Sequence, residues 1–311
     1  MKLTAEQIAA FTCGAIETEF STDDYHFSRF YPEQISAFVA RAQIYDQRCR
    51  STCGIRLEFE TDSTTIRVDV KAAGRYELLV DGLQVVLQNC DAGDTLYANL
   101  GEGNKYITVM LPWHSEGVLS FVMLDEGAYA KPHQFDRKFL FLGDSITQGA
   151  TSKQDSVAYA CRVARWFNAD YINQGVGGTK FFPETLVKPN FEPDTVFIAY
   201  GTNDFNSMPS IEVIEDNCRK YLDTVKSWYP SARIYVISPL WRLDGNMVRA
   251  AGTLDQVREV IIKQTEAHGL THIDGYKLVP HDPMYYADKC LHPDALGMSI
   301  YAEQLLKMIS K

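Results

Sequence analysis

The second half of the chain alternates short apolar stretches with longer amphipathic ones, and this alternation restricts the possible folds more than any other feature. The apolar stretches have the length of buried strands, and the longer stretches have the length and periodicity of helices. The predicted strands span 139–142, 170–173, 194–200, 233–238 and 271–274, and the predicted helices span 156–167, 211–228, 253–268 and 294–309. This alternation predicts an α/β fold in which a parallel sheet is covered by helices on both faces.

The first part of the chain has a different pattern, which predicts antiparallel β-structure. The predicted strands span 55–60, 65–70, 76–80, 83–87, 106–111 and 118–123. Asp81-Gly82 separates two of them, and its glycine permits the positive φ that a two-residue hairpin needs. Short strands at close, regular spacing are typical of a jelly-roll-like β-sandwich. We therefore expect a β-sandwich domain over residues 1–131 and an α/β domain over residues 132–311.

Composition excludes several classes of function. With 46% apolar residues in 311, the chain can bury a sizeable core. Its net charge of −10 argues against nucleic acid or an anionic membrane as a partner, because either would require a basic surface. No apolar stretch is long enough to span a bilayer, and residues 1–7 lack the apolar core of a signal peptide, so we expect a cytoplasmic protein.

The cysteines indicate free thiols rather than a disulfide framework. Seven cysteines at scattered positions are an odd number, which fits a reducing compartment. Cys49 and Cys53 are close together, but no second Cys or His pair accompanies them at the spacing of a zinc site. We predict no metal site.

The first of four unusual polar turns follows the strand at 139–142. It reads Gly143-Asp144-Ser145-Ile146-Thr147. A serine at the carboxyl end of a buried strand lies where open α/β sheets place their chemistry. Thr147 occupies the place of the second glycine in the Gly-x-Ser-x-Gly elbow, so this is not an α/β-hydrolase motif. A Gly-Asp-Ser seen alone would more often only build a turn.

The second and third turns follow the next two strands. The second reads Asn173-Gln174-Gly175-Val176-Gly177-Gly178-Thr179, and the third reads Gly201-Thr202-Asn203-Asp204. The glycines allow backbone N–H groups to face an anion, and the Lys-Ser/Thr of a phosphate-binding P-loop is missing, which favours an oxyanion-binding loop. The neutral carboxamide of Asn203 can donate to a developing oxyanion, although such an Asn can also simply cap a turn.

The fourth turn precedes the last predicted helix and reads Asp288-Lys289-Cys290-Leu291-His292-Pro293-Asp294. A histidine with a carboxylate nearby suits a general base whose tautomer that carboxylate holds. A lone His-Pro would more often be a helix-entry turn.

Together, the four turns resemble the blocks of the SGNH (GDSL) hydrolase superfamily, over residues 137 to 310. The resemblance implies a flavodoxin-like α/β/α domain and a serine esterase without cofactor or metal. Matched block by block, it implies Ser145 as nucleophile, His292 as general base, and an oxyanion hole made by Ser145, Gly178 and Asn203. Gly177 and Gly175 are alternatives to Gly178. Asp144, Thr202 and Asp204 are expected to be scaffold residues that hold the turns.

The last block departs from the family pattern, which places Asp three residues before the His. Lys289 stands there, and Asp288 lies one residue further back. Either the loop bulges so that Asp288 still reaches the imidazole, or the enzyme works as a Ser-His dyad. We favour Asp288 as the third catalytic residue.

The two-domain layout resembles carbohydrate esterase family 2, which removes acetyl groups from polysaccharides and oligosaccharides, and also some SGNH acyltransferases. This resemblance implies an oligosaccharide ester as substrate. Trp241, after the strand at 233–238, is a candidate for stacking on a sugar ring, or else a loop anchor. The alternatives are a lipid or thioester hydrolase or acyltransferase on the same site, and a non-catalytic glycan-binding protein. The sequence makes no prediction of oligomeric state.

Overall fold

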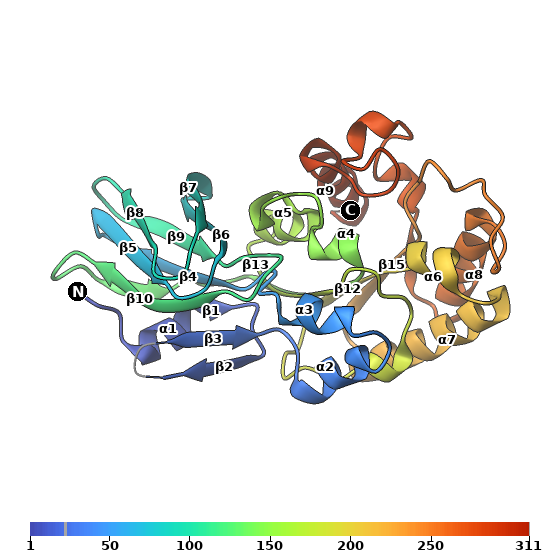
Figure 1. Ribbon diagram of the computed structural model, residues 1–311, viewed down its shortest axis with the longest axis horizontal. Coiled ribbons are helices and arrows are strands. Elements are labelled where there is room, and N and C mark those ends of the chain that lie inside the picture. The colour runs from blue at the N-terminus through green and yellow to red at the C-terminus, as the bar shows by residue number, and fades with distance from the viewer. Residues whose placement is uncertain (22–23, 311) are drawn as a thin grey trace.

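The first part of the chain forms two antiparallel sheets that pack face to face in the computed structural model, which describes residues 1–21 and 24–310 (Figure 1). One sheet has the order β1-β4-β9-β6-β7, with β11 also paired to β4, and the other has the order β2-β3-β10-β5-β8. The strands are β1 (Thr12–Cys13), β2 (Glu17–Phe20), β3 (Tyr25–Ser28), β4 (Arg56–Thr61), β5 (Thr65–Val70), β6 (Gly74–Val80), β7 (Leu83–Cys90), β8 (Thr95–Asn99), β9 (Lys105–Met110), β10 (Val118–Leu124) and β11 (Ala130–Pro132). Leu57 and Val109 of one sheet and Val68 of the other are fully buried in the shared core. The predicted β-sandwich is confirmed.

The hairpin between β6 and β7 also agrees with the sequence. Val80 pairs with Leu83, and the two intervening residues, Asp81 and Gly82, have φ values of 49° and 80°. Two consecutive positive φ angles match the right-handed twist of the strands, which is why such turns carry Asp-Gly.

A parallel sheet forms the centre of the second part, with the order β13-β12-β14-β15-β16. Its strands are β12 (Arg137–Gly143), β13 (Ala169–Gly175), β14 (Thr195–Ala199), β15 (Arg233–Ile237) and β16 (Thr271–Ile273). In chain order this is 2-1-3-4-5, the flavodoxin-like arrangement, so the α/β prediction is confirmed. The predicted helix at 156–167 starts later than expected, because extended backbone at Ala158 separates a 3₁₀ turn (Asp155–Val157) from α5 (Tyr159–Trp166).

Helices cover both faces of this sheet, and β12 shows why. Its alternate residues point to opposite faces: Leu140 and Leu142 join one core, and Phe139 and Phe141 join the other. The first core is covered by α2 (Pro32–Val39), α3 (Ile44–Arg50), α7 (Ile211–Trp228) and α8 (Leu254–Ala267), and the second by α5 and α9 (Ala295–Ile309). The remaining α-helices are α1 (Ala5–Phe11), α4 (Ser145–Gln148) and α6 (Thr202–Ser207).

Two of these covering helices come from the first fifty residues, where the sequence indicated no such role. Phe38 of α2 and Tyr45 of α3 are buried in the same core as Leu140. The sequence at 25–31 is rich in aromatic residues, and these divide between two cores, with Phe27 in the sandwich core and Phe30 in the α/β core. An N-terminal segment therefore completes the α/β layer, and the domain boundary between residues 131 and 132 stays a prediction.

Three further properties concern the part of the chain that the structure describes. All seven cysteines are free thiols. Among residues 1–21 and 24–310, none of the helices combines the length and the apolar character that a bilayer crossing requires. Within the same residues, His, Cys, Asp and Glu side chains nowhere gather in threes that could hold a metal ion.

Arg29 joins the N-terminal segment to the parallel sheet. Its side chain is fully buried, and its guanidinium donates to the carbonyls of Asn173 (2.8 Å) and Gly175 (2.6 Å) at the end of β13. It also donates to the carbonyls of Arg48 (2.7 Å) and Ser51 (2.8 Å) and to the Ser51 hydroxyl (3.0 Å). Burial lowers the pKa of Arg29, yet every N–H direction of the guanidinium finds an acceptor.

We expect Arg29→Met to lower the free energy of unfolding by at least about 2 kcal/mol, because several buried carbonyls would lose their only charged donor. Urea unfolding followed by fluorescence would measure the change. Arg219→Met is the control, since Arg219 is exposed on α7 and should cost less than about 0.5 kcal/mol. Equal stability of both variants would contradict the linking role of Arg29.

Candidate active site

The sheet order brings three of the four predicted turns together at the carboxyl ends of neighbouring strands. β13, β12 and β14 are neighbours, and parallel strands end at the same side of the sheet. Ser145 begins the short helix α4 directly after β12, the glycine-rich loop follows β13, and Asn203 lies at the start of α6 after β14. Segments that are far apart in sequence thus meet around Ser145.

The fourth turn completes the group from the loop before α9. The Oγ of Ser145 lies 2.8 Å from Nε2 of His292, which is hydrogen-bonding distance. Ser145 is 9% exposed, so its hydroxyl is largely shielded from bulk water but still reaches the cavity described below. This arrangement allows the imidazole to take the serine proton.

Asp288 reaches the other nitrogen of the imidazole. Its Oδ2 lies 2.7 Å from Nδ1 of His292, while its Oδ1 accepts the backbone N–H groups of Cys290 (2.9 Å) and Leu291 (2.8 Å). Lys289 adopts a φ of 60°, so the loop takes the extra residue as a local bulge. Partial burial raises the pKa of Asp288, but the hydrogen bonds from Leu291 and His292 outweigh it and lower the pKa to about 2.

On the opposite side of Ser145 lie donors suited to a developing negative charge. Gly178 has a φ of 82° and Asn203 follows β14, and both line the cavity together with Ser145. Within residues 1–21 and 24–310, the backbone N–H groups of Ser145 and Gly178 have no hydrogen-bond partner. The carboxamide of Asn203 donates to the Thr179 carbonyl (3.1 Å) and to Oδ2 of Asp144 (3.4 Å), and these two contacts orient it. Gly175 does not line the cavity, because its backbone packs against α4.

The glycine-rich loop is held from outside the α/β sheet. Arg48 donates to the carbonyl of Gly177 (2.5 Å) and the hydroxyl of Tyr45 donates to the carbonyl of Gly178 (2.9 Å). Gln148 of α4 accepts the N–H of Gly177 (2.8 Å). Hydrogen bonds thus hold the carbonyls of Gly177 and Gly178 and the N–H of Gly177. These bonds fix the orientation of the peptide between the two glycines, and with it the direction of the Gly178 N–H.

A cavity of about 460 Å³ opens over this group. Its lining consists of Ile44, Gln47, Arg48, Trp113, His114, Ser145, Gln148, Ala150, Gly177, Gly178, Asn203 and His292. Trp241 is not part of this lining; its ring stacks on His281 with centroids 5.6 Å apart. The aromatic residue at the cavity is Trp113, which sequence reasoning missed along with Arg48. Neither lies in a motif, because both reach the cavity only through the packing of the first part of the chain.

The three predicted scaffold residues are buried beneath the turns. Asp144 accepts the N–H of Ile146 at 2.9 Å and so caps α4, and Asp204 accepts the N–H of Phe181 at 3.2 Å. Burial raises the pKa of each carboxyl to about 7. Thr202 accepts a hydrogen bond from Arg242. None of the three lines the cavity over Ser145 among the described residues.

Comparisons with known proteins identify the family and the fold. The model of the GDSL-like Lipase/Acylhydrolase family matches residues 141–300. A salicylyl-acyltransferase, SsfX3, from a tetracycline biosynthetic pathway has a TM-score of 0.82 at 21% identity, covering 96% of this chain and 93% of that chain. No curated protein matches the chain.

Two carbohydrate esterases share the fold over both parts of the chain. A family two carbohydrate esterase from Clostridium thermocellum, solved in complex with cellohexaose, has a TM-score of 0.67 at 20% identity and covers 84% of this chain and 93% of that chain. A family two carbohydrate esterase from Cellvibrio japonicus has a TM-score of 0.68 at 16% identity, with 96% and 93% covered.

We expect Asp288→Asn to reduce the rate of ester hydrolysis by about 10²-fold or more, because an amide NH₂ cannot accept the Nδ1–H of His292. The rate of p-nitrophenyl acetate hydrolysis would measure this. Lys289→Gly is the matched control, since glycine favours the positive φ and leaves the Asp288–His292 contact in place. A loss of less than about tenfold in Asp288→Asn would favour a Ser-His dyad.

Arg48→Met should lower kcat by about tenfold and leave KM within about twofold, because the Gly178 N–H would lose its aim and oxyanion donors act mainly in the transition state. Tyr45→Phe should have a smaller effect in the same direction. Arg50→Met is the control, because Arg50 lies on the same helix and pairs with Asp46 on the surface. An unchanged kcat in Arg48→Met would show that this contact does not position the loop.

Proposed function

The chain belongs to the GDSL-like lipase/acylhydrolase family, and on that premise we propose that it is a serine esterase that removes small acyl groups, acetyl above all, from carbohydrates. The observation that carries the proposal is the continuous contact from Ser145 through His292 to Asp288, at 2.8 and 2.7 Å. That contact opens into a cavity large enough for part of an oligosaccharide.

Acylation begins with the Ser145 hydroxyl, which donates to Nε2 of His292 while the imidazole keeps its other proton on Nδ1, facing Asp288. As Oγ attacks the ester carbonyl, the proton moves to Nε2, and the ionised Asp288 stabilises the imidazolium that forms. The protonated His292 then gives this proton to the ester oxygen of the sugar as the bond between that oxygen and the acyl carbon breaks, so the sugar leaves with a free hydroxyl. The acyl group stays on Ser145.

The negative charge of the tetrahedral intermediate falls on the carbonyl oxygen. The backbone N–H groups of Ser145 and Gly178 and the carboxamide of Asn203 are its donors in this proposal, and they are oriented before the substrate arrives. Water activated by His292 then attacks the acyl-enzyme and releases the carboxylic acid. Both half-reactions use the same donors.

A carbohydrate substrate is supported by the cavity and by the fold. The indole of Trp113 offers a ring face for a pyranose, and Gln47 and His114 offer polar groups that suit sugar hydroxyls. The two family two carbohydrate esterases have the same order of domains as this chain, which is an analogy of architecture.

Acetate release from acetylated xylo-, manno- and gluco-oligosaccharides tests the proposal. We expect release by the wild-type protein and a loss of about 10³-fold or more in Ser145→Ala. Ser227→Ala, on the surface of α7, should keep wild-type activity. Release that does not differ between wild type and Ser145→Ala would refute the mechanism.

Three further measurements separate the alternatives. In a series of p-nitrophenyl esters, octanoate preferred over acetate by about tenfold would favour a lipid or thioester hydrolase. A product in which the acyl group has moved to a second alcohol would favour acyl transfer. If a phosphonate or sulfonyl fluoride fails to label Ser145 and no ester is cleaved, the protein is a non-catalytic glycan-binding protein.

A further inference from the structure

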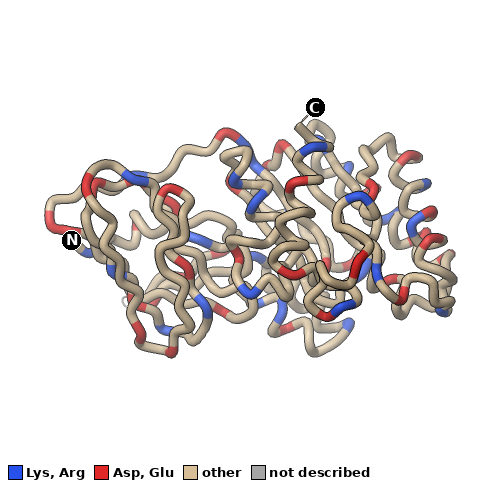
Figure 2. The backbone as a smooth tube through the Cα atoms, turned by 90° about the horizontal axis from the view of Figure 1, so that it is seen from above, with Lys and Arg blue, Asp and Glu red and all other residues tan. Residues whose placement is uncertain are grey.

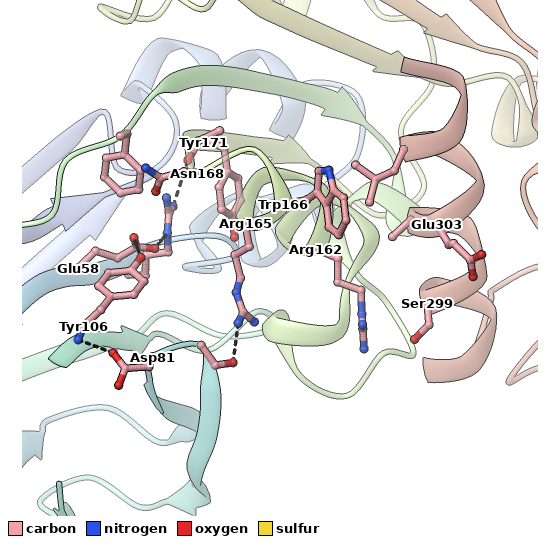
Figure 3. Close-up of a pocket in the computed structure, with 16 residues that line it drawn as sticks. Glu58, Asp81, Tyr106, Arg162, Arg165, Trp166, Asn168, Tyr171, Ser299 and Glu303 are labelled. Carbon is pink, nitrogen blue, oxygen red and sulfur yellow. Dashed lines mark hydrogen bonds and ion pairs between the residues drawn. The ribbon is translucent and has the colours of Figure 1, made fainter. Parts of the chain in front are cut away.

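A second cavity, of about 660 Å³, lies at the other end of the parallel sheet (Figure 3). It is bordered by the β-sandwich, by α5 and by α9, next to the beginning of β13. Its lining consists of Arg56, Glu58, Asp81, Gly82, Tyr106, Phe135, Arg162, Arg165, Trp166, Asn168, Ala169, Tyr171, Ser299, Ala302, Glu303 and Leu306. Among the described residues it shares no lining residue with the cavity over Ser145.

The acidic side chains of this cavity already have partners. Glu58 contacts the buried guanidinium of Arg56, and Glu303 pairs with Lys307 at 2.6 Å. Asp81 accepts a backbone N–H of β9 at 2.8 Å. Glu58 and Glu303 are therefore paired with cations and Asp81 is held by a hydrogen bond, and among the described residues none of the three forms an ion pair with Arg162 or Arg165.

Arg162 and Arg165, in contrast, have no carboxylate partner in the part of the chain that the structure describes. Arg162 donates from Nε to the Val157 carbonyl (3.1 Å), and Arg165 donates to the carbonyl of Gly82. Partial burial lowers the pKa of Arg162, and the charge of Arg165 lowers it further. Two like charges in a partly enclosed cavity repel each other, and a bound anion would relieve this repulsion.

An exposed aromatic ring lies on the same helix. Trp166 is 70% exposed and stands four residues after Arg162, so both side chains occur on one face of α5 (Figure 3). Ser299 of α9 faces this helix across the cavity. An indole face beside guanidinium and hydroxyl donors suits a ring that carries both C–H groups and polar substituents.

We propose that this cavity is a second binding site, for an anionic saccharide whose carboxylate or phosphate lies at Arg162 and Arg165 and whose ring lies on Trp166. The cavity has the volume of a small-molecule site. The site is separate from Ser145, so it does not depend on the esterase activity proposed above.

Calorimetry with the Ser145→Ala protein tests this site without substrate turnover. The probes are digalacturonate, glucose 6-phosphate and the neutral disaccharide galactobiose. We expect one or both anionic probes to bind at least about tenfold more tightly than galactobiose, with weaker binding at higher salt. The stronger of the two identifies carboxylate or phosphate as the recognised group. Equal binding of all three probes, or binding of none, would overturn the proposal.

Two variants assign the binding to this cavity. Arg162→Gln and Trp166→Ala should each weaken binding of the preferred anionic probe by about tenfold, and Arg219→Gln on α7 should not. Trp166→Ala removes an exposed ring, so it is expected to fold even if Arg162→Gln is unstable. In protein that keeps Ser145, both variants should hydrolyse p-nitrophenyl acetate at the wild-type rate. This measurement separates a failure of the second binding site from a failure of the esterase proposal. Unchanged binding in Trp166→Ala would exclude the site.

Discussion

The buried guanidinium of Arg29 is the interaction on which the arrangement of the protein most depends. It donates hydrogen bonds to two separate stretches of the chain, namely to carbonyls at the end of β13 and to carbonyls at the end of α3. A buried positive charge is tolerated only where its donors are satisfied, so the carbonyls must stay in place around it. The relative position of the N-terminal segment and the parallel sheet is thereby restricted.

This restriction reaches the candidate active site through a short chain of contacts. Arg48 lies in the stretch that Arg29 holds, and its own side chain bonds to Gly177. The loop that carries Gly178 is therefore supported from two sides, by α4 beneath it and by α3 beside it. The first part of the chain is consequently a structural part of the site and not an attachment to a finished α/β domain.

The two cavities lie at opposite ends of the strands of the same parallel sheet, and they are lined by different chemical groups. At the carboxyl ends of the strands, turns and helix starts present N–H groups, a hydroxyl and an imidazole. At the amino end of β13, the end of α5 and the hairpin of the sandwich present guanidinium groups and an indole. Viewed from above, the Lys and Arg positions are spread along the backbone and interspersed with Asp and Glu positions, and the chain as a whole carries a net charge of −10 (Figure 2).

The sequence by itself determined the features that depend on local chemistry. Strand–helix alternation determined the parallel sheet, Asp81-Gly82 determined a hairpin, and the turns after three strands indicated Ser145, Gly178 and Asn203. Such features follow from periodicity and from backbone angles, which neighbouring residues specify.

Only the tertiary structure decided which distant groups meet. The sequence left open whether Asp288 reaches His292; the positive φ of Lys289 turns the loop so that it does. Trp241 had a plausible position after a strand, yet Trp113 and Arg48 line the cavity instead. Contacts of this kind depend on how whole segments pack and on buried donors such as Arg29, and no short stretch of sequence contains that information.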